Sequence, residues 1–246
     1  MSQLNIRDFE AVAWDFDGVL SDIAAHTVAR RQAYSYLAEV KNEPRYSAIS
    51  DEVHEEAHFH GSNPHTINGW ILEQVGIEDE GAVDEIVQQK ERFYQEVAQT
   101  GLPAIPGALH LLRAISVDRP AKQALASTAK DWEVKPFLQR HKLHSYIPAH
   151  RLVLRGHPEV TNLKPAPDAY VAAGKLLGVA CPENLLVIED SEQGIEAAKR
   201  YGAFVVVVAN TRSVERLTSI DGVHKPDLIF ASTTALTIAL GYAKAA

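Results

Sequence analysis

Near its N-terminus the chain reads Ala11-Val12-Ala13-Trp14-Asp15-Phe16-Asp17-Gly18-Val19-Leu20-Ser21-Asp22. The apolar run predicts a buried strand that stops at two carboxylates, Asp15 and Asp17, before Gly18 allows a turn. Ligands bind at the carboxyl ends of strands in a parallel sheet. Because crowded carboxylates repel unless a cation lies between them, the stretch predicts a site for a hard divalent ion. The same residues also suit an ordinary turn after a strand, so the rest of the chain must decide.

The composition is that of a soluble globular protein. The chain has 246 residues, of which 46% are hydrophobic and 23% charged, enough for one large α/β domain with or without a smaller insert. The formal net charge of -8 argues against nucleic-acid and membrane partners, which need basic surface to neutralise phosphate. Cys181 is the only cysteine, so an intramolecular disulfide is excluded. We see neither a signal peptide nor a long apolar span, and expect a cytoplasmic protein.

Two regions of different character follow the first strand. Helix formers predominate between residues 23 and 98, which predicts an all-helical insert. Beyond it, expected helices (107–115, 133–140, 167–177, 194–201) alternate with expected strands (122–126, 184–188, 204–208, 227–230). This alternation predicts a doubly wound, mostly parallel, Rossmann-like sheet with the first strand central, beside residues 184–188. The α/β core would comprise residues 1–22 and 99–246, and the helical domain residues 23–98.

A second candidate site follows the strand expected at residues 122–126, where the chain reads Ala126-Ser127-Thr128. A hydroxyl and the backbone N–H groups after it can hold a phosphate oxygen without using charge. Ser127 is equally suited to cap the next helix. The motif therefore leaves phosphate binding and helix capping open.

A third candidate is Lys164, in Asn162-Leu163-Lys164-Pro165-Ala166-Pro167-Asp168. The two prolines stiffen the backbone, and Pro167 suits the first turn of a helix. A rigidly placed ammonium would stabilise charge on an attacking carboxylate and on a transferring phosphoryl group. Most lysines are instead solvated at the surface.

The fourth motif is Leu185-Leu186-Val187-Ile188-Glu189-Asp190-Ser191-Glu192-Gln193-Gly194. Again an apolar strand runs into acids, so Glu189 and Asp190 are expected at the same sheet edge as Asp15. The start of a capped helix would also explain Asp190 and Ser191.

Taken in order, the four motifs resemble the haloacid dehalogenase-like (HAD) hydrolase superfamily. Leu-Lys-Pro-Ala-Pro-Asp and Ile-Glu-Asp-Ser-x-x-Gly resemble its β-phosphoglucomutase-like branch of phosphatases and phosphomutases. The resemblance covers nearly the whole chain. It implies a HAD-like core with an inserted helical C1-type cap that closes over the metal site, excludes water and reads the leaving group.

The resemblance also implies roles for individual residues. Asp15 would be the nucleophile that becomes an aspartyl phosphate, and Asp17 the acid that protonates the leaving oxygen and later activates water. The implied cofactor is Mg²⁺, held by Asp15, the backbone carbonyl of Asp17, Asp190 and, as a supporting or water-mediated ligand, Glu189. Phosphate binding would fall to Ser127, Lys164 and, more weakly, Thr128.

An acid at Asp17 separates this chain from two kinds of relative. Haloacid dehalogenases lack an acid there, and phosphonatases have a small residue and form a Schiff base on a cap lysine. Because a general acid suits an oxygen leaving group, the expected substrate is a phosphate ester or phosphoanhydride.

The expected cap departs from the phosphomutase pattern. Mutases use a histidine in the first cap helix, where this chain has Thr27 beside His26. They also use an arginine shortly after a glycine, where this chain reads Ser62-Asn63-Pro64-His65. Lys90 resembles a cap lysine of the branch. His65 and Lys90 are therefore the expected substrate contacts of the cap.

The sequence thus predicts a Mg²⁺-dependent phosphatase that hydrolyses a small phosphorylated metabolite, such as a sugar phosphate, through an aspartyl phosphate. A phosphomutase would use the same aspartate but protect the phosphoenzyme from water. A non-catalytic phosphate-sensing module is a third alternative, although receiver-like domains are shorter and have no comparable insert.

Overall fold

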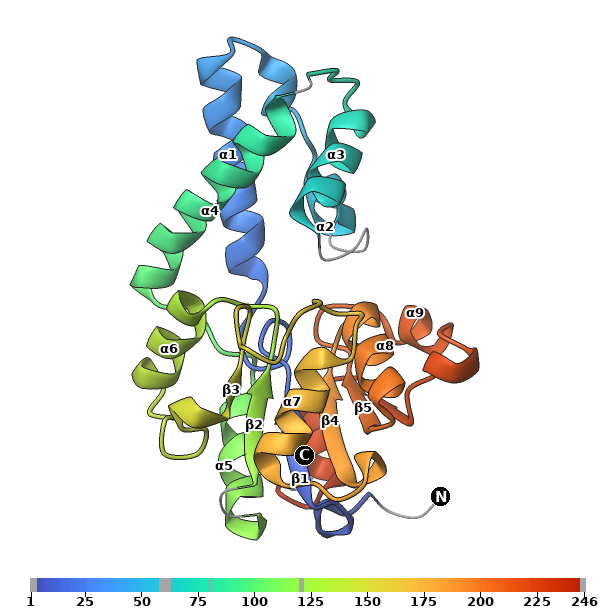
Figure 1. The fold of residues 1–246 in the computed structure, drawn as a ribbon. Helices are drawn as coiled ribbons and strands as arrows, with labels where there is room; N and C mark the ends of the chain where they lie inside the picture. The colour runs from blue at the N-terminus through green and yellow to red at the C-terminus, as the bar shows by residue number, and fades with distance from the viewer. Residues whose placement is uncertain (1–3, 58–62, 80, 120–121, 244–246) are drawn as a thin grey trace. The chain divides into compact units, whose positions relative to one another are not determined.

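The computed structural model describes residues 4–57, 63–79, 81–119 and 122–243. Contacts divide the chain into two compact units, which we call the sheet unit and the helical unit (Figure 1). The sheet unit comprises Met1–Asp22 and Pro103–Ala246, and the helical unit comprises Ile23–Leu102. The second boundary lies beyond residue 98 because the last helix of the helical unit, α4 (Ala82–Thr100), continues past that point.

Six strands of the described residues form one sheet in the order β3-β2-β1-β4-β5-β6, and each neighbouring pair is parallel (Figure 1). They are β1 (Ala11–Trp14), β2 (Gln123–Ala126), β3 (Leu152–Val153), β4 (Leu185–Glu189), β5 (Phe204–Val208) and β6 (Leu228–Phe230). Strands β1, β2 and β4 are buried along their whole length, as expected for a parallel sheet covered on both faces. The topology confirms the predicted α/β fold class.

Strand β1 lies in the middle of the sheet, between β2 and β4. Ala13 pairs with Ala124 on one side and with Val187 on the other. Trp14, the last residue of β1, pairs with Ile188, so Asp15 and Glu189 follow at the same edge of the sheet. The register therefore brings the first and fourth motifs together, as the sequence predicts.

Helices of the sheet unit cover the two faces of its sheet. They are α5 (Ala108–Asp118), α6 (Asp131–Arg140), α7 (Asp168–Leu177), α8 (Glu192–Tyr201), α9 (Val214–Thr218) and α10 (Thr233–Ala239), with short 3-10 turns at Ile6–Asp8, Ala149–Arg151, Pro182–Asn184 and Gly222–His224. On one face, small strand residues such as Ala13 and Ala124 share a buried cluster with Tyr170 and Ala173 of α7. On the other face, Gln123 of β2 donates to Leu112 O of α5 at 3.2 Å.

The sequence analysis predicts neither helices α9 and α10 nor strand β3. Only Leu152 and Val153 form β3, within the basic stretch from His150 to His157. Leu152 pairs with Leu125 and Val153 with Ala126 of β2. A two-residue strand between charged residues has too short an apolar run for a periodicity argument to detect.

The helical unit contains α1 (Ala24–Val40), α2 (Asp51–Glu56), α3 (Pro64–Gln74), α4 and a 3-10 turn at Pro44–Tyr46. Its own apolar cluster includes Tyr34 and Leu37 of α1, Ile71 of α3 and Ile86 of α4. Among the described helices of both units, none combines the length and apolar character needed to cross a membrane.

Candidate active site

Three of the four motifs meet at Lys164. The loop before α7 carries Lys164, whose Nζ donates to Oδ1 of Asp15 at 2.5 Å and to Oε1 of Glu189 at 2.7 Å. Asp15 is itself fixed to the neighbouring strand, because its N–H donates to Ile188 O at 3.0 Å. All three side chains are buried. The ammonium therefore bridges a carboxylate after β1 and a carboxylate at the end of β4.

Burial and charge shift the pKa values of these groups in different directions. Burial lowers the pKa of Lys164, but Asp15 and Glu189 outweigh that effect and hold it above its ordinary value. Burial raises the pKa of Glu189, but the charge and hydrogen bond of Lys164 overcome it and leave the pKa lowered. For Asp15 burial prevails, and its pKa is raised although Lys164 opposes the shift. Lys164 therefore lies between Glu189, whose carboxyl pKa is lowered, and Asp15, whose carboxyl pKa is raised.

Asp190 completes a buried acidic cluster with Asp15 and Glu189. One carboxylate oxygen of each lies within 4.8 Å of the others. Burial raises the pKa of Asp190 to about 6, although the charge of Arg212 opposes the rise. Two cations, Lys164 and Arg212, therefore face three carboxylates, which leaves one negative charge that a bound cation could offset.

The donor chemistry of this acidic cluster suits a hard divalent cation. Carboxylate oxygens are the ligands that Mg²⁺ and Ca²⁺ prefer. Burial raises the pKa values of Asp15 and Asp190, and a bound cation would oppose this shift by stabilising their ionised forms. Gly18 has φ +83°, and a Cβ at that position would overlap the Asp190 carboxyl group. The chain therefore approaches Asp190 at a point where only glycine fits.

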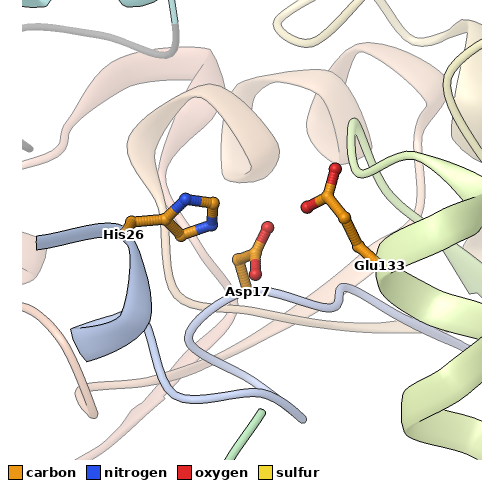
Figure 2. A group of neighbouring side chains, drawn as sticks. All are labelled: Asp17, His26 and Glu133. Carbon is orange, nitrogen blue, oxygen red and sulfur yellow. The ribbon is translucent and has the colours of Figure 1, made fainter. Parts of the chain in front are cut away.

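Asp17 faces another acid of the sheet unit. Figure 2 shows its carboxyl group with that of Glu133 from α6, and the nearest oxygens of the two are within 4.8 Å. Glu133 is buried and its Oε1 accepts the N–H of Lys130 at 2.9 Å. This hydrogen bond fixes the start of α6 immediately after the second motif.

The second motif has the geometry of a turn in this structure. Ser127 follows β2, is buried, and accepts the N–H of Ala129 on its Oγ at 3.1 Å. Its own N–H donates to Val153 O of β3 at 3.0 Å. The hydroxyl keeps its proton for donation, and Thr128 beside it is half-buried.

The two expected cap residues lie in separate parts of the helical unit. His65 in the first turn of α3 has its Nε2 3.0 Å from Oδ1 of Asp84 on α4, and both are exposed. Lys90 of α4 has its Nζ 2.9 Å from Nδ1 of His26, the third side chain labelled in Figure 2, and 5.2 Å from the ring centroid of Tyr94. Ser62 in the stretch before His65 lies outside the described residues.

Sequence reasoning missed Glu133, which faces Asp17, and three residues that contact Lys164, Glu189 or Asp190. Tyr170 of α7 contacts both Lys164 and Glu189, and Thr211 and Arg212, on the loop after β5, contact Asp190. Tyr170 occupies a position that helical periodicity assigns to the core. Arg212 belongs to no motif, so only the fold shows its place beside Asp190.

Comparison with known proteins gives sequence matches along most of the chain. Over 146 aligned residues it is 32% identical to (DL)-glycerol-3-phosphatase 1, mitochondrial, of Arabidopsis thaliana, which covers 58% of this chain and 47% of that protein. The chain thus spans about half the length of that relative. It is 27% identical to phosphoglycolate phosphatase of Escherichia coli (strain K12), covering 96% of this chain and 94% of that protein.

The fold is also shared with solved structures. A HAD hydrolase of family IA, variant 3, from Entamoeba histolytica HM-1:IMSS aligns with a TM-score of 0.71 and 25% identity, over 94% of this chain and 96% of that one. Residues 9–202, which include all four motifs, match the family described as haloacid dehalogenase-like hydrolase. With the sheet order, the acidic cluster and this match in agreement, the chain belongs to the haloacid dehalogenase-like hydrolases.

Proposed function

We propose that this protein is a Mg²⁺-dependent phosphatase that hydrolyses a small phosphorylated metabolite through a phosphoryl group carried on Asp15. The observation that carries the proposal is the bridge of Lys164 between Asp15 and Glu189, at distances of 2.5 and 2.7 Å. A buried ammonium fixed against a carboxylate is suited to phosphoryl transfer, which depends on positioning and on neutralisation of oxygens.

In the first step, the Asp15 carboxylate attacks phosphorus while the bond from phosphorus to the leaving oxygen breaks. Asp17 donates a proton to that oxygen and is left as a carboxylate. In the second step, Asp17 takes a proton from water, the hydroxide attacks the phosphoryl group, and inorganic phosphate leaves as Asp15 is regenerated. The two steps together consume one water and return both acids to their starting states.

The remaining residues hold the reacting groups. Lys164 keeps Oδ1 of Asp15 in place and offsets negative charge beside it, and the hydroxyl of Ser127 and the half-buried Thr128 would donate to phosphoryl oxygens. Asp15, Asp190 and the backbone carbonyl of Asp17 would hold Mg²⁺, with Glu189 in support. When bound, Mg²⁺ supplies positive charge for the carboxylates and the phosphoryl oxygens.

The relatives support the class of substrate. One relative is named a glycerol-3-phosphatase and another a phosphoglycolate phosphatase. The substrate in each name is a phosphate ester of a small molecule. We accordingly propose a phosphate monoester of a small metabolite, such as a sugar phosphate, with specificity residing in the helical unit. His65 and Lys90 are the proposed substrate contacts there.

The experiment measures phosphate release from sugar phosphates, glycerol 3-phosphate, phosphoglycolate, nucleotides and pyrophosphate, with Mg²⁺ and with a chelator. The proposal expects Mg²⁺-dependent release from at least one monoester and none from the Asp15→Asn protein. Glu159→Gln, which changes an exposed acid paired with Lys175, serves as the matched control and retains activity. Unchanged release by Asp15→Asn contradicts the proposal.

The same samples separate the two alternatives. An assay for isomerised sugar phosphate reports a phosphomutase if isomer forms without free phosphate. A long-lived phosphoprotein with negligible release of phosphate would instead indicate the sensing module.

A further inference from the structure

Tyr170 lies in a part of α7 where a tyrosine serves as a core residue. Its side chain is completely buried and belongs to the apolar cluster that includes Ala13 and Ala173. Phenylalanine would fill the same space in the core. Tyrosine adds a hydroxyl, and a buried hydroxyl needs a hydrogen-bond partner to offset the loss of its contacts with water.

The hydroxyl of Tyr170 lies between the side chains of Lys164 and Glu189. Its oxygen is 2.9 Å from Nζ of Lys164 and 2.6 Å from Oε1 of Glu189. An ammonium only donates and a carboxylate only accepts, so the hydroxyl must accept from Lys164 and donate to Glu189.

Glu189 is held by the backbone and provides a fixed reference for this arrangement. Its Oε2 accepts from the N–H groups of Asp190 and Ser191, at 2.9 and 3.1 Å, and from the hydroxyl of Ser191 at 3.1 Å. A Cβ at Gly194 would overlap its carboxyl group, so α8 packs directly against it. The carboxylate therefore cannot shift without moving the start of α8.

Lys164 has three N–H donors, and three acceptors surround it: Asp15, Tyr170 and Glu189. A lysine side chain is flexible, so the direction of its ammonium depends on these partners. The ring of Tyr170 adds a second contact, because Nζ lies 4.7 Å from its centroid. Without the hydroxyl, one donor of Lys164 loses its partner and the ammonium can rotate away from Asp15.

We propose that Tyr170 is a positioning residue, whose hydroxyl fixes the direction in which Lys164 presents its ammonium to Asp15. It acts through Lys164 and does not touch the phosphoryl group. The inference rests on the proposed function, since it assigns Lys164 the task of holding Asp15 during phosphoryl transfer.

Tyr170→Phe removes the hydroxyl and keeps the ring, and Tyr170→Leu removes both. Tyr201→Phe is the matched control, because Tyr201 packs against the same apolar cluster and its hydroxyl lies beside Gly174, away from the acidic cluster. The measurements are kcat and KM for p-nitrophenyl phosphate with Mg²⁺, the inhibition constant of orthovanadate as a phosphoryl mimic, and the thermal unfolding of each protein.

We expect Tyr170→Phe to lower kcat about tenfold and to weaken orthovanadate inhibition, with KM changed less than about twofold and unfolding nearly unchanged. Tyr201→Phe should match the wild type in all of these. Tyr170→Leu should lower kcat further than Tyr170→Phe does. If Tyr170→Leu alone is less stable, the comparison of Tyr170→Phe with the wild type still holds.

Kinetic parameters of Tyr170→Phe within about twofold of the wild type would overturn the inference while leaving the proposed function intact. If the wild type itself neither hydrolyses the ester nor binds orthovanadate, the proposed function fails and the inference fails with it. The wild-type and variant arms therefore distinguish the two failures.

Discussion

Arg212 donates from Nη1 to Oδ2 of Asp190 at 3.1 Å, and the two side chains are only 9% and 3% exposed. Thr211 donates to the same oxygen. Removing one partner of a buried ion pair leaves the other charge buried and uncompensated, with little access to water. We therefore expect Arg212→Met to lower the free energy of unfolding by about 3 kcal/mol, measured by urea titration without added metal.

The control for this prediction is a neighbouring ion pair at the surface. Arg216 lies 2.6 Å from Glu192, but these side chains are 40% and 29% exposed. Arg216→Met should cost less than about 1 kcal/mol, because water screens the pair. An equal decrease in the free energy of unfolding in the two variants would show that the buried Arg212–Asp190 pair contributes no more to stability than the exposed pair.

Gly18 offers a prediction about metal binding. Its φ of +83° disfavours any side chain, and a Cβ would overlap the Asp190 carboxyl group. Gly18→Ala should therefore raise the Mg²⁺ concentration needed for half-maximal phosphate release at least about tenfold. Gly178→Ala is the control, because Gly178 has φ +66° and no atom within 4 Å of the added Cβ. An unchanged Mg²⁺ requirement in Gly18→Ala would contradict the placement of Asp190 at the metal.

Mg²⁺ should stabilise the folded protein in proportion to its binding. A ligand that binds only the folded state adds about 2.7 kcal/mol at a concentration one hundred times its Kd. The melting temperature of the wild type should therefore rise with Mg²⁺, and that of Asp190→Asn should rise much less. Asp118→Asn is the control, because Asp118 of α5 pairs with Arg7 in the 3-10 turn at Ile6–Asp8. An equal rise in melting temperature with Mg²⁺ in both variants would show that Asp190 does not bind the metal.

His54 predicts how the helical unit responds to acid. The side chain is buried, and burial, followed by the charges of Arg30 and Arg31, lowers its pKa from 6.5 to about 4. Because the unfolded chain binds the proton more tightly, this residue's contribution to stability is complete above pH 6.5 and is lost as the pH falls toward 4.

Acidification from pH 7 to pH 4.5 should therefore destabilise the wild type by about 2 kcal/mol more than His54→Gln, in parallel urea titrations. His65→Gln, which changes an exposed histidine of the same unit, should follow the wild type. If His54→Gln shows the same acid response as the wild type, His54 is not the group responsible.

The sequence was sufficient to predict which strand ends would converge. Asp15 and Glu189 follow apolar runs whose order along the chain implies a parallel sheet, and the register of β1 with β4 places both at the same edge. Lys164 lies in a proline-stiffened loop and follows no strand; only the family resemblance implied its place in the site, where its ammonium contacts both carboxylates. The prediction succeeded because the topology of an alternating α/β chain fixes which ends of its strands share an edge.

The contacts that support these residues could not be predicted in the same way. Tyr170 lies on the buried face of α7, so periodicity gives its burial but not the partner of its hydroxyl. Arg212 follows β5 in a loop without a motif and reaches Asp190 only because β4 and β5 are neighbours. Both contacts depend on packing between elements that are separate in the sequence, and periodicity carries no information about that packing.

A phosphoryl group carried on Asp15 should be detectable as a covalent intermediate. The most direct test is a rapid acid quench of the Mg²⁺-loaded protein with a radiolabelled form of whichever monoester it hydrolyses, followed by identification of the labelled peptide. We expect transient label on the peptide that contains Asp15, at a rate able to support turnover, and no labelled protein with Asp15→Asn. Label on a different residue, or turnover by Asp15→Asn at the wild-type rate, would contradict this expectation.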